Sequence, residues 1–164
     1  MRSLLQNLGG HNEFEDYRNW FRGLYCDPYR PVVDVMGRRV IFDTYPTLDD
    51  CAHTCYGGTA GHAYNSAFWN QERAERIAWI EIALTRPNRV HPDEKIQTNQ
   101  KYLLYVQPEA VEQDAEYYVV IVRVLNPKTV AFLTAYPISH SKFQEFGRIG
   151  PRVYPPSQPK KKKR

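Results

Sequence analysis

Long hydrophobic runs and a cysteine framework are both missing from this sequence of 164 residues. No stretch approaches the roughly 20 apolar residues that a membrane-spanning helix needs. The N-terminal segment also lacks the continuous apolar stretch of a secretory signal. Only three cysteines occur, Cys26, Cys51 and Cys55, and an odd number without a regular spacing favours free thiols in a reducing compartment. We therefore expect a cytoplasmic protein that has no contact with a membrane.

Metal-ligand and cofactor motifs are also missing. The Cys-Ala-His-Thr-Cys fragment at 51–55 holds closely spaced ligands, but a structural zinc site commonly uses two spaced pairs. Only Cys26 and scattered histidines could supply the second pair. The sequence contains no Walker loop, nucleotide-binding glycine motif, His-Glu-x-x-His helix or Gly-x-Ser-x-Gly turn. We expect no metal and no cofactor, and we disfavour nucleotide-driven and classical hydrolase chemistry.

An excess of positive charge is missing outside the last few residues. The formal net charge is +4, from 22 basic and 18 acidic residues. Five of the basic residues close the chain: Lys160, Lys161, Lys162, Lys163 and Arg164. Positions 1–159 therefore hold 17 basic against 18 acidic residues. The tail is a candidate tether to RNA, with a nuclear import signal and a solvated chain end as alternatives. We expect one domain over residues 1–154 and a disordered basic tail over 155–164.

Hydrophobic periodicity predicts two helices in the first half of the chain. Residues 11–25 repeat aromatic side chains on one face, and residues 69–84 repeat apolar side chains at helical spacing. The β-branched segment 32–43 predicts two short strands around a tight turn, or one bulged strand. Residues 44–68 are polar and irregular, which is typical of a long functional loop.

The second half of the chain has the composition of a sheet. Three segments are rich in β-branched and aromatic residues, namely 101–106, 117–125 and 130–136. Asn126-Pro127-Lys128 predicts the turn between the last two, and His91-Pro92 predicts a simple turn. The sequence thus predicts an α+β fold, with N-terminal helices packed on a small antiparallel sheet of about four strands.

The last predicted strand carries a hydroxyl and a phenol close together. With a side-chain period of two, Phe132, Thr134 and Tyr136 would point to one face, and Leu133 and Ala135 to the other. This pattern fits a binding surface at the end of the strand. It equally fits an edge strand in which Thr and Tyr were selected for β-propensity.

Two arginines lie on or near the apolar stripe of the helix predicted at 69–84. Arg73 falls within the stripe and Arg76 at its margin. An inward-facing guanidinium needs an anionic partner to offset its desolvation. That partner is either a ligand or a nearby carboxylate, such as Glu72, Glu75 or Glu81.

Two histidines are candidates for acid–base chemistry. His53 and His62 lie in the polar, glycine-containing segment 44–68, and an imidazole titrates near neutral pH. A histidine in a loop can also be a bystander, and the sequence alone leaves both interpretations open.

Taken in chain order, these segments resemble the barnase–EndoU–colicin–RelE superfamily of small nucleases, especially its branch in phages and polymorphic toxins. The resemblance covers residues 31–138. Its most specific pieces are the Arg-Ile-Ala-Trp-Ile helix and the terminal Thr-Ala-Tyr-Pro. The others are Val-Val-Asp-Val with Arg-Val-Ile-Phe-Asp, and Tyr-Tyr-Val-Val-Ile-Val-Arg-Val.

The resemblance implies an α+β fold and RNA cleavage without a metal. In that chemistry the ribose 2′-hydroxyl attacks the adjacent phosphate, so a base, a cation for the phosphorane charge and a donor for the leaving oxygen are needed. His53 would be the base or acid, with His62 as its substitute. The implied partners are RNA, possibly tRNA, and a cognate immunity or antitoxin protein.

The resemblance also implies roles for the strand and helix residues. Arg76, or Arg73 as the alternative, would hold the phosphate in a planar fork. Thr134 and Tyr136 would hydrogen-bond the phosphate or a base, and the Tyr136 ring could stack on a base.

Two other functions are also compatible with the sequence. One is a catalytically inactive protein of the same fold that binds a partner through residues 44–68. The other is an ADP-ribosyltransferase-like domain that uses Arg38 or Arg39, Thr134 and Glu145. A toxin delivered into another cell and a nuclear protein are the alternatives to a cytoplasmic location.

Overall fold

The computed structural model describes residues 14–43, 50–56, 69–106, 115–148 and 152–155. His62 and the basic residues 160–164 lie outside these ranges, so their expected roles remain predictions. No helix in the described ranges is long and apolar enough to cross a bilayer.

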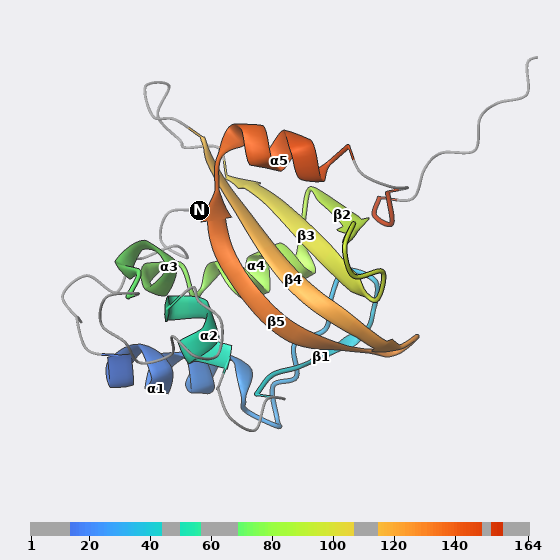
Figure 1. Cartoon of the computed structure of the whole chain (residues 1–164). Coiled ribbons are helices and arrows are strands. Elements are labelled where there is room, and N and C mark those ends of the chain that lie inside the picture. The colour runs from blue at the N-terminus through green and yellow to red at the C-terminus, as the bar shows by residue number, and fades with distance from the viewer. Residues whose placement is uncertain (1–13, 44–49, 57–68, 107–114, 149–151, 156–164) are drawn as a thin grey trace, which may run out of the picture.

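A five-stranded sheet forms the centre of the protein, in the order β1-β5-β4-β3-β2 (Figure 1). Its strands are β1 (Arg39–Ile41), β2 (Arg89–Pro92), β3 (Asn99–Val106), β4 (Glu116–Asn126) and β5 (Thr129–Ile138). β1 pairs parallel to β5, and all the other pairs are antiparallel. The predicted α+β class is confirmed, with one more strand than expected. The added strand is β2, which contains the His91-Pro92 pair predicted to be a simple turn.

Five helices surround the sheet in the described ranges. They are α1 (Phe14–Tyr25), α2 (Asp50–Tyr56), α3 (Gln71–Glu75), α4 (Trp79–Thr85) and α5 (His140–Phe146). The larger core lies between one sheet face and α1 to α4. α5 covers the opposite face of the sheet (Figure 1). There Leu103 and Val119 pack against Phe143 and Phe146. Tyr102–Leu104 of β3 and Tyr118–Val120 of β4 are buried on both faces, which explains why these parts of the strands are continuously apolar.

The helix predicted at 69–84 is two helices, so the prediction of one continuous element was wrong. The backbone from Arg76 to Ile80 makes i to i−3 bonds, such as Ile77 N to Ala74 O at 3.3 Å. The Tyr25 hydroxyl donates to the Ile77 carbonyl at 2.7 Å and accepts from the Glu81 N–H at 3.4 Å. It thereby occupies the position of one helical hydrogen bond, an insertion that breaks or kinks a helix.

The break lets two differently oriented apolar stripes reach the core. Ala74 of α3 is buried on one side of the break, and Trp79 and Leu84 of α4 are buried on the other. A straight helix would have left one of these stripes in solvent, since its apolar residues do not share one face.

Segment 44–68 contains a helix, because α2 covers Asp50–Tyr56. The expectation that His53 lies in an irregular loop was therefore wrong.

Segment 32–43 follows one of its two predicted forms: Val33 bridges to Arg39 across a tight turn. Gly37 has φ +77° there, a conformation that favours glycine.

A β-bulge interrupts β5 at the position that matters most for the site. Ile121 pairs with Thr134 and the next residue, Val122, pairs with Phe132, so Leu133 is the extra residue. The alternation of side chains shifts there. Phe132 and Ala135 both belong to the larger core, whereas Tyr136 packs on the α5 side. The prediction that Phe132 and Tyr136 share one face was wrong for this reason.

Candidate anion site at the end of β5

The Arg73 guanidinium is held against the last part of β5. Its Nη2 donates to Thr134 Oγ1 at 3.0 Å and to the Ala135 carbonyl at 3.2 Å. Its central carbon lies over the Tyr136 ring, 5.0 Å from the centroid. Asn70 caps α3 and accepts from the Arg73 N–H at 3.0 Å, so the backbone that carries this arginine is also fixed.

The topology makes this part of β5 available to side chains from the helices. β1 pairs with β5 only from Thr129 to Ala131. Beyond Ala131, α2 and α3 contact β5 in place of a strand. The bulge at Leu133 then turns Thr134 and Tyr136 so that both meet Arg73.

Arg73 has no carboxylate partner among the described residues. Every ion pair found among those residues is made by another basic side chain. Arg73 instead contacts the Thr134 hydroxyl, the Ala135 carbonyl and the Tyr136 ring. Burial lowers its pKa, and the nearby Tyr118 hydroxyl opposes that effect. A half-buried cation stabilised only by neutral groups is a favourable position for a bound anion, because the anion would supply the missing opposite charge.

Two buried donors at this site have no hydrogen-bond partner within the described ranges. They are Arg73 Nε and the Tyr118 hydroxyl. Burial is the largest cause that raises the pKa of Tyr118, and Arg73 opposes it, so the two groups interact. A native interior pairs most of its buried polar atoms. The site therefore has more donor capacity than its described acceptors use.

Arg76 is placed differently from Arg73, although three residues separate them. Its Nη2 pairs with Glu116 at 3.0 Å and with Glu72 at 3.4 Å, and its Nη1 donates to the Glu72 carbonyl at 2.9 Å. The guanidinium also lies over the Trp79 ring, 5.3 Å from its centroid. The two carboxylates neutralise this cation and join the α3–α4 junction to the start of β4.

The structure thus brings Arg73, Thr134 and Tyr136 together, whereas Arg76 is engaged beside them. Of the two arginines expected to hold a phosphate, Arg73 has the geometry and the uncompensated charge. The sequence could not separate them, because the partner of Arg76 is Glu116, which is distant in the chain.

His53 extends the site from α2. Burial is the main cause that lowers its pKa, a hydrogen bond with the Leu133 backbone partly opposes this, and the Arg73 charge adds to the lowering. The imidazole is therefore neutral at neutral pH. Its Nδ1 is buried, and the ring links α2 to the bulge that orients Thr134. His53 accordingly lies next to the Arg73 cluster and supports it.

Tyr136 remains a protonated phenol at neutral pH. Burial raises its pKa, with Arg73 and Lys142 acting in the opposite direction. A neutral phenol can donate a hydrogen bond to a phosphate oxygen while Arg73 covers its ring. The arrangement supplies a planar cation, a hydroxyl and a phenol at one place.

A second polar network, which the sequence did not indicate, is buried under the turn after α1. Arg38 Nε donates to Asp34 Oδ2 at 2.9 Å, and the Tyr102 hydroxyl donates to the same carboxylate at 2.6 Å. Arg38 Nη2 also donates to Gln100 at 2.7 Å. This network joins the 32–39 turn to β3. Its saturated arginine disfavours Arg38 as part of a dinucleotide site.

A shallow cavity of about 360 Å³ lies beside α5, and no sequence pattern pointed to it. Its lining comes from β2, β3, β4 and α5: Asn88, Arg89, Tyr105, Tyr117, Phe143 and Gln144. The sequence had not predicted α5 or β2, so it gave no way to bring these residues together.

No protein-family model, curated protein or solved structure matches this chain. Within the described ranges, no group of three or more His, Cys, Asp or Glu side chains is placed to hold a metal ion.

Proposed function

We propose that this protein is a metal-independent endoribonuclease of the toxin or effector type. One observation carries the proposal: Arg73 is a half-buried cation without a carboxylate partner in the described ranges, held by Thr134 and Tyr136 from the far end of β5. Because Nη2 already donates to Thr134 and Ala135, Nη1 is the nitrogen that can donate to a phosphate oxygen, in a charge-assisted hydrogen bond. The resemblance to small nucleases makes an RNA phosphodiester the substrate.

The reaction starts with attack of the ribose 2′-oxygen on the adjacent phosphorus. The bond from phosphorus to the 5′-oxygen breaks and that oxygen takes up a proton from water, leaving a 2′,3′-cyclic phosphate and a free 5′-hydroxyl. Negative charge builds up on the non-bridging oxygens, where Arg73 and the Tyr136 hydroxyl donate to them. Thr134 fixes the guanidinium plane through the bond to Nη2.

A histidine takes the 2′ proton in this proposal. His53 is neutral because its pKa is lowered, which suits a base, but its contact with the Leu133 backbone also suits a positioning role. His62 is the second candidate from the sequence. Separate His53→Ala and His62→Ala variants distinguish the two, since loss of the base lowers kcat more than loss of a positioning contact.

The decisive experiment incubates the purified protein with tRNA and total RNA in the presence of EDTA. Wild type is compared with the paired variant His53→Ala/Tyr136→Phe. We expect cleavage products that end in a cyclic phosphate from the wild type alone. Equal cleavage by both proteins, or no cleavage by the wild type on any RNA, would refute the proposal.

A further inference from the structure

The cavity beside α5 contains a second cation that has no anionic partner among the residues the structure describes. Arg89 is half-buried, and its guanidinium carbon lies 4.6 Å from the Phe143 ring centroid. Among the described residues it makes no side-chain hydrogen bond and no ion pair. Gly147 leaves room for it, since a Cβ there would lie 2.5 Å from Arg89 Nη1. The fold thus holds this guanidinium at the cavity without satisfying its donors.

Aromatic rings and amides complete the lining. Tyr105 and Tyr117 pair across β3 and β4, with ring centroids 5.2 Å apart. The Asn88 side-chain oxygen accepts from the Tyr105 N–H at 2.6 Å, which leaves its amide donors for another acceptor. The Gln144 side-chain amide has no hydrogen bond within the described ranges. Rings that can stack, amides that can read an edge and a free guanidinium are the groups that bind a nucleotide.

The cavity and the Arg73 site share one face of the sheet. Tyr105, Tyr117 and Tyr136 all pack on the α5 side. Arg73 lies over Tyr136 of β5, and Arg89 belongs to β2, at the other edge of the four antiparallel strands. Three strand spacings separate β5 from β2, or about 14 Å. The line of paired residues from Tyr136 to Arg89 passes through Val119 and Leu103 beneath α5, and Tyr117 and Tyr105 lie beside it, two residues along β4 and β3.

We infer that the α5 cavity binds a further nucleotide, not the adjacent one, of the same RNA strand whose phosphate occupies the Arg73 site. Its base stacks on Tyr105 and Tyr117, and its phosphate pairs with Arg89. Asn88 and Gln144 bond to the edge of the base. The identity of the strand depends on the proposed function, whereas the cavity geometry does not.

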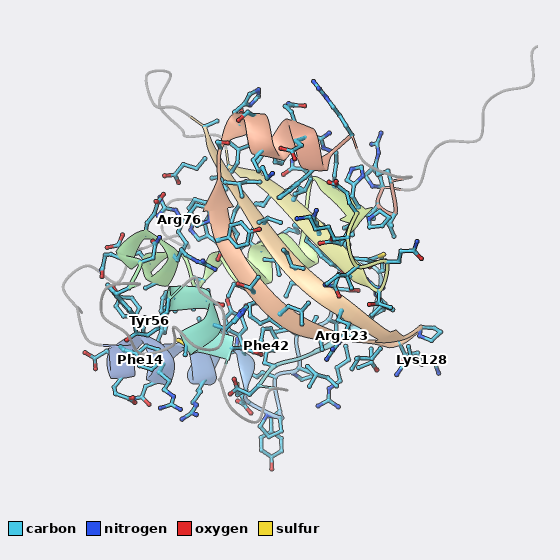
Figure 2. The ribbon with its side chains drawn as sticks, viewed as in Figure 1. Phe14, Phe42, Tyr56, Arg76, Arg123 and Lys128 are labelled. Atoms are coloured by element: carbon cyan, nitrogen blue, oxygen red, sulfur yellow. The ribbon has the colours of Figure 1, made fainter. Side chains whose placement is uncertain are left out.

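The test uses a short 2′-O-methyl oligoribonucleotide, which keeps bases and phosphates but has no attacking hydroxyl. Fluorescence anisotropy over a range of salt concentrations gives its affinity for wild type and for a set of variants. Arg89→Met removes the charge, and Tyr105→Leu removes a stacking ring. Arg123→Met is the matched control, since it is an exposed strand arginine at the opposite end of β4 (Figure 2).

We expect Arg89→Met to weaken binding and to reduce the slope of log K against log salt by about 0.7, the value of one single-strand phosphate contact. Tyr105→Leu should weaken binding about tenfold with the slope unchanged. Arg123→Met should change neither quantity. Gly147→Ala is a further variant that keeps every charge, and it should weaken binding because it displaces the Arg89 guanidinium.

The inference is overturned if Arg89→Met, Tyr105→Leu and Gly147→Ala, all shown by thermal melting to be folded, bind like wild type. It is also overturned if wild type does not bind the oligonucleotide, or if Arg123→Met reproduces the loss. If the cavity variants bind the oligonucleotide like wild type and still cleave RNA, the cavity inference fails and the proposed function remains. Weakened binding in those variants without any RNA cleavage by wild type would support the cavity and refute the nuclease.

Discussion

The Arg73 guanidinium lies over the Tyr136 ring at 5.0 Å, across the junction between the α3 helix and the last strand of the sheet. α3 carries Arg73 to β5, and the bulge at Leu133 sets the side of the sheet to which Tyr136 points. Together they place a cation, a hydroxyl and a phenol around one point.

Replacing Arg73 by lysine tests whether the planar fork matters. A lysine at this position would keep the charge but has no rigid fork that could contact Thr134, Ala135 and a phosphate oxygen at once. We expect kcat of RNA cleavage to fall roughly 10²- to 10³-fold in Arg73→Lys, the usual cost of a lost transition-state donor. Arg76→Lys is the control, since Arg76 already pairs with two carboxylates. An equal loss in both variants would contradict the assignment.

The Thr134 hydroxyl can be removed with little change of shape. Thr134→Val keeps the β-branched side chain but leaves the Arg73 N–H without this acceptor. A hydrogen bond to a charged group contributes about 1.5–3 kcal/mol, so kcat should fall roughly 10- to 100-fold. Thr129→Val, earlier in the same strand, provides the reference. Steady-state cleavage rates that match wild type would exclude Thr134 from the site.

His53 gives the stability of the fold a defined pH dependence. Its pKa in the folded protein is lowered from the ordinary value of 6.5, chiefly by burial. As the pH falls through about 6.5, the unfolded chain binds this proton first, so the free energy of unfolding decreases. Urea unfolding at neutral and mildly acidic pH should show the decrease in wild type and much less of it in His53→Gln. The exposed His140, changed in the same way, should leave the wild-type decrease intact.

The buried pair of Asp34 and Arg38 should dominate the stability of the turn after α1. Asp34→Asn leaves the Arg38 charge buried without its partner, which costs about 3–5 kcal/mol. Tyr102→Phe removes one hydrogen bond to the same carboxylate and should cost about 1–3 kcal/mol. Urea denaturation measures both values. A smaller loss in Asp34→Asn than in Tyr102→Phe would contradict this ranking.

The sequence predicted the strands whose apolar composition sets them apart from the rest of the chain. The apolar segments that became β3, β4 and β5 were found with small errors at their ends, because strands buried on both faces have a distinctive composition. α5 was missed because it is short and buries only Phe143 and Phe146. The break between α3 and α4 was missed because Tyr25, which causes it, lies far earlier in the chain.

The sequence predicted which residues belong to the candidate site, but not which of them contact one another. Arg73, Thr134 and Tyr136 were all named from their spacing, and they do meet. The preference for Arg76 over Arg73 could not be corrected from the sequence, since it depends on where β4 begins and brings Glu116 to Arg76. The alternation across β5 could not be predicted either, because the extra residue of a bulge leaves no mark in a strand of apolar residues.

Both outer strands of the sheet are covered by irregular backbone. Val40 of β1 donates to the Val32 carbonyl, and Val90 of β2 donates to the Tyr154 carbonyl, each at 2.9 Å. Exposed edge strands are templates for pairing with another chain. With these donors already occupied, a peptide cannot extend this sheet by adding a strand at Val40 or Val90. Strand addition by another chain is therefore blocked at these two positions of the sheet edges.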